Sequence, residues 1–89
     1  MNNHVPVDLI PLGKIVKPHG ILGEVKIRLF NSESKTLKVG QSVWVGIQGK
    51  KNESLVIERL TLKSEKSRLK FKSINDRNSA ELLRDFTLS

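Results

Sequence analysis

The sequence predicts an all-β domain, a small antiparallel barrel of five or six short strands with one short helix near the C-terminal end. Three observations lead to this fold class. Apolar and polar residues alternate with the two-residue period of half-buried strands. Turn-forming Gly, Asn and Ser separate these stretches at short intervals. The length of 89 residues, with a hydrophobic fraction of 37%, allows one small domain with a thin aliphatic core.

The first two strands are expected at residues 9–17 and 22–30, joined by a tight crossing. Pro18 fixes its own φ and lacks an amide donor, while Gly20 and Gly23 permit backbone angles that other residues avoid, so the chain turns here. The second strand alternates apolar Val25, Ile27 and Leu29 with charged Glu24, Lys26 and Arg28. This alternation predicts an apolar inner face and a charged outer face.

The third and fourth strands are expected at Ser42–Gln48 and Ser54–Lys63, and residues 49–52 are typical of the hairpin turn between them. The third strand directs Val43, Val45 and Ile47 to one side. Trp44 lies on the other side, where it either packs beneath a loop or offers a surface for stacking. The fourth strand carries apolar residues on both faces, as a central or strongly coiled strand does. Its two rows are Val56, Leu60 and Leu62, and Leu55 and Ile57.

A fifth strand is expected at residues 68–73, where Leu69 and Phe71 point inward. The outward residues are the cations Arg68, Lys70 and Lys72. Same-face residues lie about 7 Å apart, so this row can follow a nucleic-acid backbone without recognising its sequence. The alternative is a solvated outer face or a lysine-protected sheet edge. The last short strand is expected at Phe86–Leu88.

A short helix is expected at residues 78–84, because Asn78 and Glu81 have the spacing of a capping box. Its inward side chains are expected to be Ala80, Leu82 and Leu83. Asp76 and Arg77 precede the helix. They either pair with backbone groups to fix the turn or contribute to binding.

The charge of the chain indicates a polyanionic partner. Sixteen Lys and Arg stand against nine Asp and Glu, which gives a formal net charge of +7 and a pI of about 10.1. Such an excess on a small domain raises its affinity for polyanions, and RNA is the commonest of these in the cytoplasm. The alternative is charge that only maintains solubility.

The composition argues against catalysis. There is no cysteine, which excludes disulfides and thiolate metal sites, and two histidines do not make a metal cluster. No phosphate-binding G-x-x-x-x-G-K-[ST] motif occurs. His19 and Glu24 can form an acid–base pair across the hairpin, but no nucleophile or orienting group accompanies them. We therefore expect a binding protein, not an enzyme, with no cofactor and no metal.

Two longer motifs resemble the N-terminal domain of the ribosome maturation factor RimM family. Residues 13–27 carry the string G-K-I-V-x-P-H-G-x-x-G-E-V-K-I, which resembles the hairpin that opens this domain. Residues 76–84 are similar to the family segment D-R-N-x-A-E-x-L-R. The resemblance implies a six-stranded barrel related to translation-factor barrels at residues 9–89, after a flexible leader at residues 1–8.

The same resemblance implies a function in ribosome biogenesis. Family members are non-enzymatic cytoplasmic factors that bind immature small ribosomal subunits and assist maturation of the subunit head and processing of its rRNA. We expect their second domain, a C-terminal PRC-barrel, to be absent from this chain, and the resemblance implies that this domain chiefly makes the contact with the head ribosomal protein uS nineteen. We therefore expect a monomeric cytoplasmic domain without membrane contact, whose partner is the immature small subunit and whose ligands include rRNA.

Three positions depart from the family pattern. Lys17 stands where glycine is common, and Leu22 stands where lysine is common. Asp85 stands where a glycine often ends the helix, which puts a glycine-type C-cap in doubt. The first change adds a positive charge near the loop and the second removes one.

Two residues of the crossing have open roles. Glu24 is expected to bond to turn amides or to pair with Lys26 or Arg28. His19 either donates a hydrogen bond to a backbone carbonyl, or forms with Lys17 and Pro18 an exposed tip that docks on RNA or a ribosomal protein. A preordered tip loses less conformational entropy on binding.

The candidate site residues fall into three groups. The ribosome- or RNA-binding candidates are Lys14, Lys17, Pro18, His19, Gly20, Gly23, Lys26 and Arg28. The secondary basic row is Arg68, Lys70 and Lys72. The residues with structural roles are Glu24, Asp76, Arg77, Asn78 and Glu81. The alternative function is a stand-alone basic RNA-binding barrel without ribosome specificity, which would bind any single-stranded RNA with a steep salt dependence.

Overall fold

The computed structural model describes residues 10–30, 37–47 and 52–89. The predicted leader and residues 49–51 of the predicted hairpin turn lie outside these ranges. No helix within them is long and apolar enough to cross a membrane.

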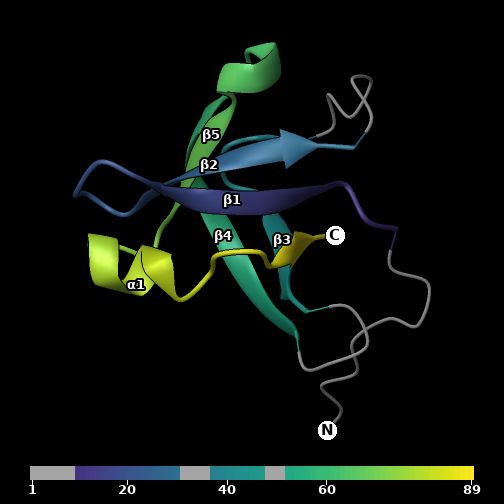
Figure 1. Ribbon diagram of the computed structural model, residues 1–89. Coiled ribbons are helices and arrows are strands. Elements are labelled where there is room, and N and C mark those ends of the chain that lie inside the picture. The colour runs from purple at the N-terminus through teal and green to yellow at the C-terminus, as the bar shows by residue number, and fades with distance from the viewer. Residues whose placement is uncertain (1–9, 31–36, 48–51) are drawn as a thin grey trace, which may run out of the picture.

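Within the described ranges, six antiparallel strands close into a barrel in the order β1-β2-β5-β4-β3-β6 (Figure 1). The elements are β1 (Gly13–His19), β2 (Glu24–Leu29), β3 (Ser42–Gly46), β4 (Asn52–Thr61), the 3₁₀ turn η1 (Ser64–Lys66), β5 (Arg68–Phe71), α1 (Arg77–Glu81) and β6 (Thr87–Leu88). The predicted six-stranded barrel with a short helix near the C-terminal end is confirmed. Figure 1 shows α1 beside the loop that joins β1 to β2.

The inward side chains of the strands fill the barrel. Phe71 is the largest fully buried side chain. The other buried hydrophobic residues are Ile15, Val25, Ile27, Leu37, Val43, Val45, Ile57, Leu69, Ala80, Leu83 and Leu88. The predicted inward rows of β2 and β5 are confirmed, although Leu29 at the end of β2 is half-buried. The core is therefore aliphatic around one aromatic ring.

A β-bulge in β1 moves the crossing further along the chain than predicted. The pairing of β1 with β2 shifts register between Ile15 and Lys17, because a bulge places one extra residue in one strand. After it, Pro18 pairs with Val25 inside the strand and is buried. The predicted end of the first strand at residue 17 is therefore wrong, and so is the placement of Pro18 in the exposed tip.

A second bulge explains the two-sided pattern of β4. Its pairing with β5 shifts register between Ile57 and Arg59. Ile57 lies opposite Phe71 and Leu60 opposite Leu69, so both face the core although three positions separate them. The predicted row that joined Leu60 to Val56 and Leu62 is wrong, because an uninterrupted two-residue period does not continue through a bulge.

The predicted alternation of β3 is confirmed for its central residues only. Val43 and Val45 are each 2% exposed, whereas Ile47 lies beyond the strand and is 49% exposed. Trp44 is half-buried, and its backbone exchanges hydrogen bonds of 3.0 and 2.9 Å with Ser89. These bonds continue the β3–β6 pairing that closes the barrel.

The helix α1 begins earlier than its predicted cap. Asp76, not Asn78, is the N-cap: its Oδ1 accepts a hydrogen bond of 2.7 Å from the Ser79 amide. The helix ends at Glu81, whose side chain pairs with Arg84. Ala80 and Leu83 are buried as predicted, but Leu82 is 75% exposed, so its predicted inward position is wrong. Asp and Asn are both preferred N-cap residues, and the structure uses Asp76.

Replacement of the cap is expected to lower stability in a pH-dependent way. The amide hydrogen bond from Ser79 holds the pKa of Asp76 below its ordinary value, so the carboxylate stabilises the folded state above the pKa of the unfolded chain, about 3.9. This stability is lost as pH falls through the lower folded pKa. Asp76→Ala should therefore lower Tm by a constant amount near neutral pH, and the difference from the unsubstituted chain should shrink below about pH 4. Thermal unfolding followed by circular dichroism checks this, and a difference that grew in acid would contradict the assignment.

Asp85 adopts the geometry that glycine was expected to supply. Its φ is +68°, the left-handed region that commonly ends a helix and that Asp tolerates better than most residues. Its amide donates a hydrogen bond of 2.8 Å to the carbonyl of Ile15, which ties the turn after α1 to β1. The C-cap of α1 itself is Leu82, in the right-handed region, so the doubt about a glycine-type C-cap is confirmed, and Asp85 ends the turn that follows the helix.

Candidate nucleic-acid interface

The outer face of β1, β2 and β5 carries three cations side by side. Lys17 lies opposite Lys26 in the β1–β2 pairing, and Lys26 lies opposite Arg68 in the β2–β5 pairing. We call Lys17, Lys26 and Arg68 the cationic row. Directly opposed residues have Cβ atoms about 4.5–5.5 Å apart, and like charges at this spacing destabilise a sheet. The row is therefore unfavourable for folding and favourable for an anion placed above it.

A second cationic pair extends this face along the strands. Lys14 lies opposite Arg28, and both side chains are exposed. Lys14 is 3.6 Å from the Asp85 carboxylate, an exposed pair of small energetic weight. The structure therefore brings the four predicted cations of the first hairpin onto one outer face.

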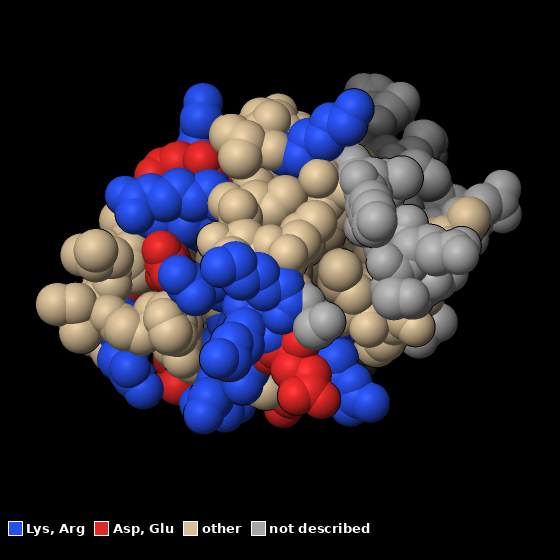
Figure 2. Space-filling model, turned by 90° about the horizontal axis from the view of Figure 1, so that it is seen from above, with Lys and Arg blue, Asp and Glu red and all other residues tan. Residues whose placement is uncertain are grey.

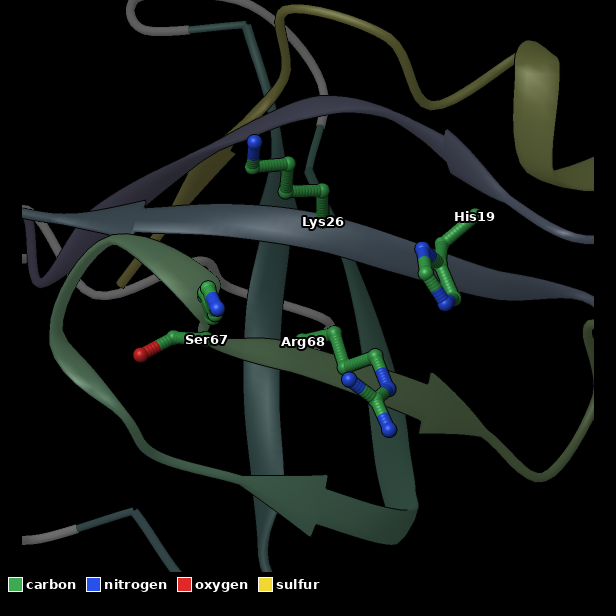
Figure 3. A pocket seen from close by; sticks show the side chains of 5 residues that line it. His19, Lys26, Ser67 and Arg68 are labelled. Carbon is green, nitrogen blue, oxygen red and sulfur yellow. The ribbon is translucent and has the colours of Figure 1, made fainter.

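A shallow hollow of about 160 Å³ opens beside the cationic row. We call it the basic hollow. Its lining residues are His19, Lys26, Lys66, Ser67 and Arg68. Figure 3 shows the His19 ring on β1 directed toward the Arg68 side chain on β5, while the Lys26 side chain on β2 extends away from Arg68 in this view. Among the residues that the structure describes, the lining of the hollow has three basic side chains and no carboxylate.

The end of the molecule that carries η1 has many basic side chains. Figure 2 looks onto this end, and Lys and Arg side chains gather near the middle of the view with a few acidic groups beside them.

Glu24 binds arginines that sequence analysis did not connect with it. Its Oε1 accepts a hydrogen bond of 3.1 Å from Arg68 Nε, and its Oε2 is 3.8 Å from Arg59 Nη1. The predicted pairing with Lys26, Arg28 or turn amides is wrong, because strand pairing sets β5 beside β2, and β4 follows β5 in the barrel. Glu24 and His19 are opposite in register, but the carboxylate is engaged by arginine.

The imidazole of His19 is exposed beside the basic hollow. The structure records no hydrogen bond from it to any described residue, so the predicted bond to a backbone carbonyl is wrong. Lys17 is exposed as well. The outward residues at the end of β1 are thus available to a partner, whereas Pro18 belongs to the core side.

The loop between β1 and β2 is fixed by contacts with α1 and the segment before it. Gly20 and Gly23 have φ of +73° and +97°, and Gly23 leaves no room for a Cβ against the carbonyl of Ile74. Arg77 Nη1 donates a hydrogen bond of 3.2 Å to the Gly20 carbonyl. The structural interpretation of Asp76 and Arg77 is thereby confirmed: one caps the helix and the other holds the loop.

The predicted secondary row on β5 does not exist as three solvated cations. Lys70 is only 4% exposed, and its Nζ donates to Asn75 Oδ1 at 2.8 Å and to the Phe71 carbonyl at 3.1 Å. Glu58 Oε1 lies 3.4 Å from the same nitrogen. Lys72 is exposed but follows the strand. Of the three predicted residues, only Arg68 belongs to the site. It does so as a member of the cationic row, which runs across β1, β2 and β5 and not along one strand.

Lys66 and Arg59 are the cations of this region that sequence analysis did not single out. Lys66 ends η1, and Arg59 follows the β4 bulge. No local pattern marks them, because both come beside the site through strand pairing between distant segments. The basic residues near the start of the fifth strand were the one feature of the sequence that could have pointed to this region.

The closed barrel and its cationic outer face define a small basic β-barrel domain. A family model described as the RimM N-terminal domain matches residues 10–89, and the chain belongs to this family. The resemblance expected from the two motifs is thus confirmed.

Curated relatives are ribosome maturation factors. The ribosome maturation factor RimM of Corynebacterium diphtheriae is 38% identical over 73 residues, which cover 82% of this chain and 44% of the relative. That of Corynebacterium glutamicum is 33% identical over 75 residues, covering 84% and 44%. The chain thus spans 44% of the length of the curated relatives it matches.

A solved structure has the same fold. A Pseudomonas aeruginosa protein described as the 16S ribosomal RNA processing protein RimM aligns with a TM-score of 0.75 at 27% identity. The alignment covers 91% of this chain and 49% of that protein. The barrel is thus nearly completely shared.

Proposed function

We propose that this domain binds immature small ribosomal subunits and assists maturation of the subunit head and processing of the small-subunit rRNA. The observation that carries the proposal is the outer face of the first hairpin, where strand register aligns Lys17 with Lys26 and Lys14 with Arg28. Membership of the RimM family and relatives that are ribosome maturation factors support it. The domain acts in the cytoplasm as a monomer.

Binding without chemistry fits the arrangement of the titratable groups. The Glu24 carboxylate is engaged by Arg68 and Arg59, and the structure records no bond between it and His19. In our proposal the face holds subunit components in place during assembly. We propose that a contact with the head protein uS nineteen is made chiefly by the second domain of family members.

Charge reversal on this face is expected to weaken subunit binding. Lys17→Glu combined with Lys26→Glu should lower association with immature small subunits by at least about tenfold, because two cations that face anions become anions. Co-sedimentation with immature subunits measures the loss. Circular dichroism should show an intact barrel, because both side chains point away from the core.

A matched reversal separates this face from general charge. Lys38 is exposed and lies outside the hairpin, so Lys38→Glu should weaken co-sedimentation less than Lys17→Glu or Lys26→Glu alone. Equal losses at all three positions, or none from the pair, would contradict the assigned face. Equal affinity for immature subunits and for any single-stranded RNA would favour the general RNA-binding barrel instead.

A further inference from the structure

We infer that the basic hollow is a binding site for one phosphate group of an RNA strand, with Arg68 as the residue that grips it and Glu24 as the residue that positions Arg68. The inference rests on the proposed function and deepens it, because it names the chemistry that this face recognises. It concerns a defined site and not the overall positive charge.

The lining of the hollow suits a phosphate group. Lys26, Lys66 and Arg68 belong to its lining, and none of the described lining residues is a carboxylate. A guanidinium presents its N–H groups in a planar fork that matches two phosphate oxygens, and lysines add point charges that do not need a fixed direction. The exposed imidazole of His19 adds a further hydrogen-bonding group at the edge.

Arg68 is held before any ligand arrives. Its Nε donates to Glu24 Oε1 at 3.1 Å, and Glu24 is only 20% exposed, while Arg68 is 40% exposed. The structure records no bond from the two Nη nitrogens of Arg68 to another described residue. A guanidinium fixed at one nitrogen and open at the others loses less side-chain entropy when an anion binds.

The surroundings favour a nucleic-acid strand over an acidic protein. Lys26 and Arg28 are two residues apart on one strand, so their side chains leave the same face about 7 Å apart. Lys17 and Lys14 lie opposite them on β1. This array repeats along the sheet, as the phosphates of a strand repeat, whereas carboxylates on a folded protein have no regular spacing. A strand with one phosphate in the hollow can therefore place its neighbours over Lys17, Lys14 and Arg28.

The test compares the loss of the positive charge of Arg68 with the loss of its planar guanidinium geometry. The 89-residue chain is titrated with labelled single-stranded oligouridine of about ten nucleotides at several salt concentrations. Arg68→Gln should weaken binding about tenfold and reduce the slope of log K against log salt by about 0.7. Arg68→Lys, which keeps the charge and loses the fork, should still weaken binding about fivefold. Lys38→Gln should weaken it less than about twofold.

Two further arms locate the site and identify the ligand class. Inorganic phosphate should shift the backbone amide NMR signals of His19, Lys26, Ser67 and Arg68 more than those of β3. Oligoglutamate of matched charge should bind more weakly than the oligouridine. Any one of three results would overturn the site. Arg68→Lys would bind oligouridine with the same affinity as the unsubstituted chain, phosphate would shift NMR signals over the whole barrel, or oligoglutamate would bind more strongly than oligouridine.

The controls separate this inference from the proposed function. The Arg68–Glu24 pair is partly exposed, so the variants should keep the barrel, and Lys26→Gln tests the same hollow if Arg68→Gln does not fold. Two results together would overturn the phosphate site and leave the proposed function standing. The Arg68→Lys and Arg68→Gln variants would still co-sediment with subunits, and the unsubstituted chain would not bind RNA. If the chain binds RNA with the expected variant effects but does not co-sediment with subunits, the phosphate site stands and the proposed function is overturned.

Discussion

Gly23→Ala is expected to destabilise the domain by about 3 kcal/mol or more, which is enough to unfold a large fraction of so small a barrel. Two effects add. The φ of +97° at Gly23 is strained for a residue with a Cβ, and the new methyl group would overlap the carbonyl of Ile74. That carbonyl belongs to the backbone before α1, so it cannot move away as a flexible side chain does. Urea unfolding followed by circular dichroism measures the change.

Gly20→Ala is the matched control. Gly20 has a φ of +73°, so the backbone strain is comparable, but no atom lies within 4 Å of the position that its Cβ would take. We expect a cost of only about 1–2 kcal/mol from strain alone. Equal losses for the two variants would show that the packing of the loop on the segment before α1 does not contribute.

Lys70→Ala is expected to cost about 2–4 kcal/mol, because the substitution removes both a buried side-chain stem and a donor shared by several acceptors. Lys70 Nζ bonds to Asn75 Oδ1 and to the Phe71 carbonyl, and it pairs with Glu58 at 3.4 Å. These groups join β4, β5 and the turn before α1. Without the ammonium group, the partly covered acceptors lose their partner.

Two companion variants divide this loss. Lys70→Met keeps the stem and removes the donor, so it should cost about half as much. Lys72→Ala removes an exposed lysine two residues further on and should change stability by less than about 0.5 kcal/mol. Thermal and urea unfolding give the three values. A loss at Lys72 equal to that at Lys70 would contradict the role of the buried ammonium group.

The sequence predicted the barrel because its core positions follow the period of a strand. Val25, Ile27, Leu69 and Phe71 were identified as inward residues in this way, and all are buried. The same rule failed where strands bulge. One extra residue in β1 and another in β4 reversed the faces after Val16 and Glu58, and no local feature of the sequence marks either bulge.

The candidate site was partly predictable for a similar reason. Lys26 and Arg28 share a face because of local alternation, so they could be named from the sequence. Lys14 and Lys17 are three residues apart and share that face only because of the β1 bulge. The partners of Glu24 depend on which strands lie side by side, and Arg68 comes from a segment 44 residues away. Burial of Lys70 depends likewise on the turn and on β4. Strand order decides these contacts, and an alternating pattern contains no information about strand order.

Residue-level labelling of lysines on the ribosomal particle tests the central claim most directly. The 89-residue chain is treated with an amine-acetylating reagent, alone and bound to immature small subunits, and acetylation is measured at each lysine by mass spectrometry. We predict that subunits protect Lys17 and Lys26 and leave Lys38 and Lys72 as reactive as in the free chain. Protection of Lys38 and Lys72, with Lys17 and Lys26 unchanged, would contradict the account.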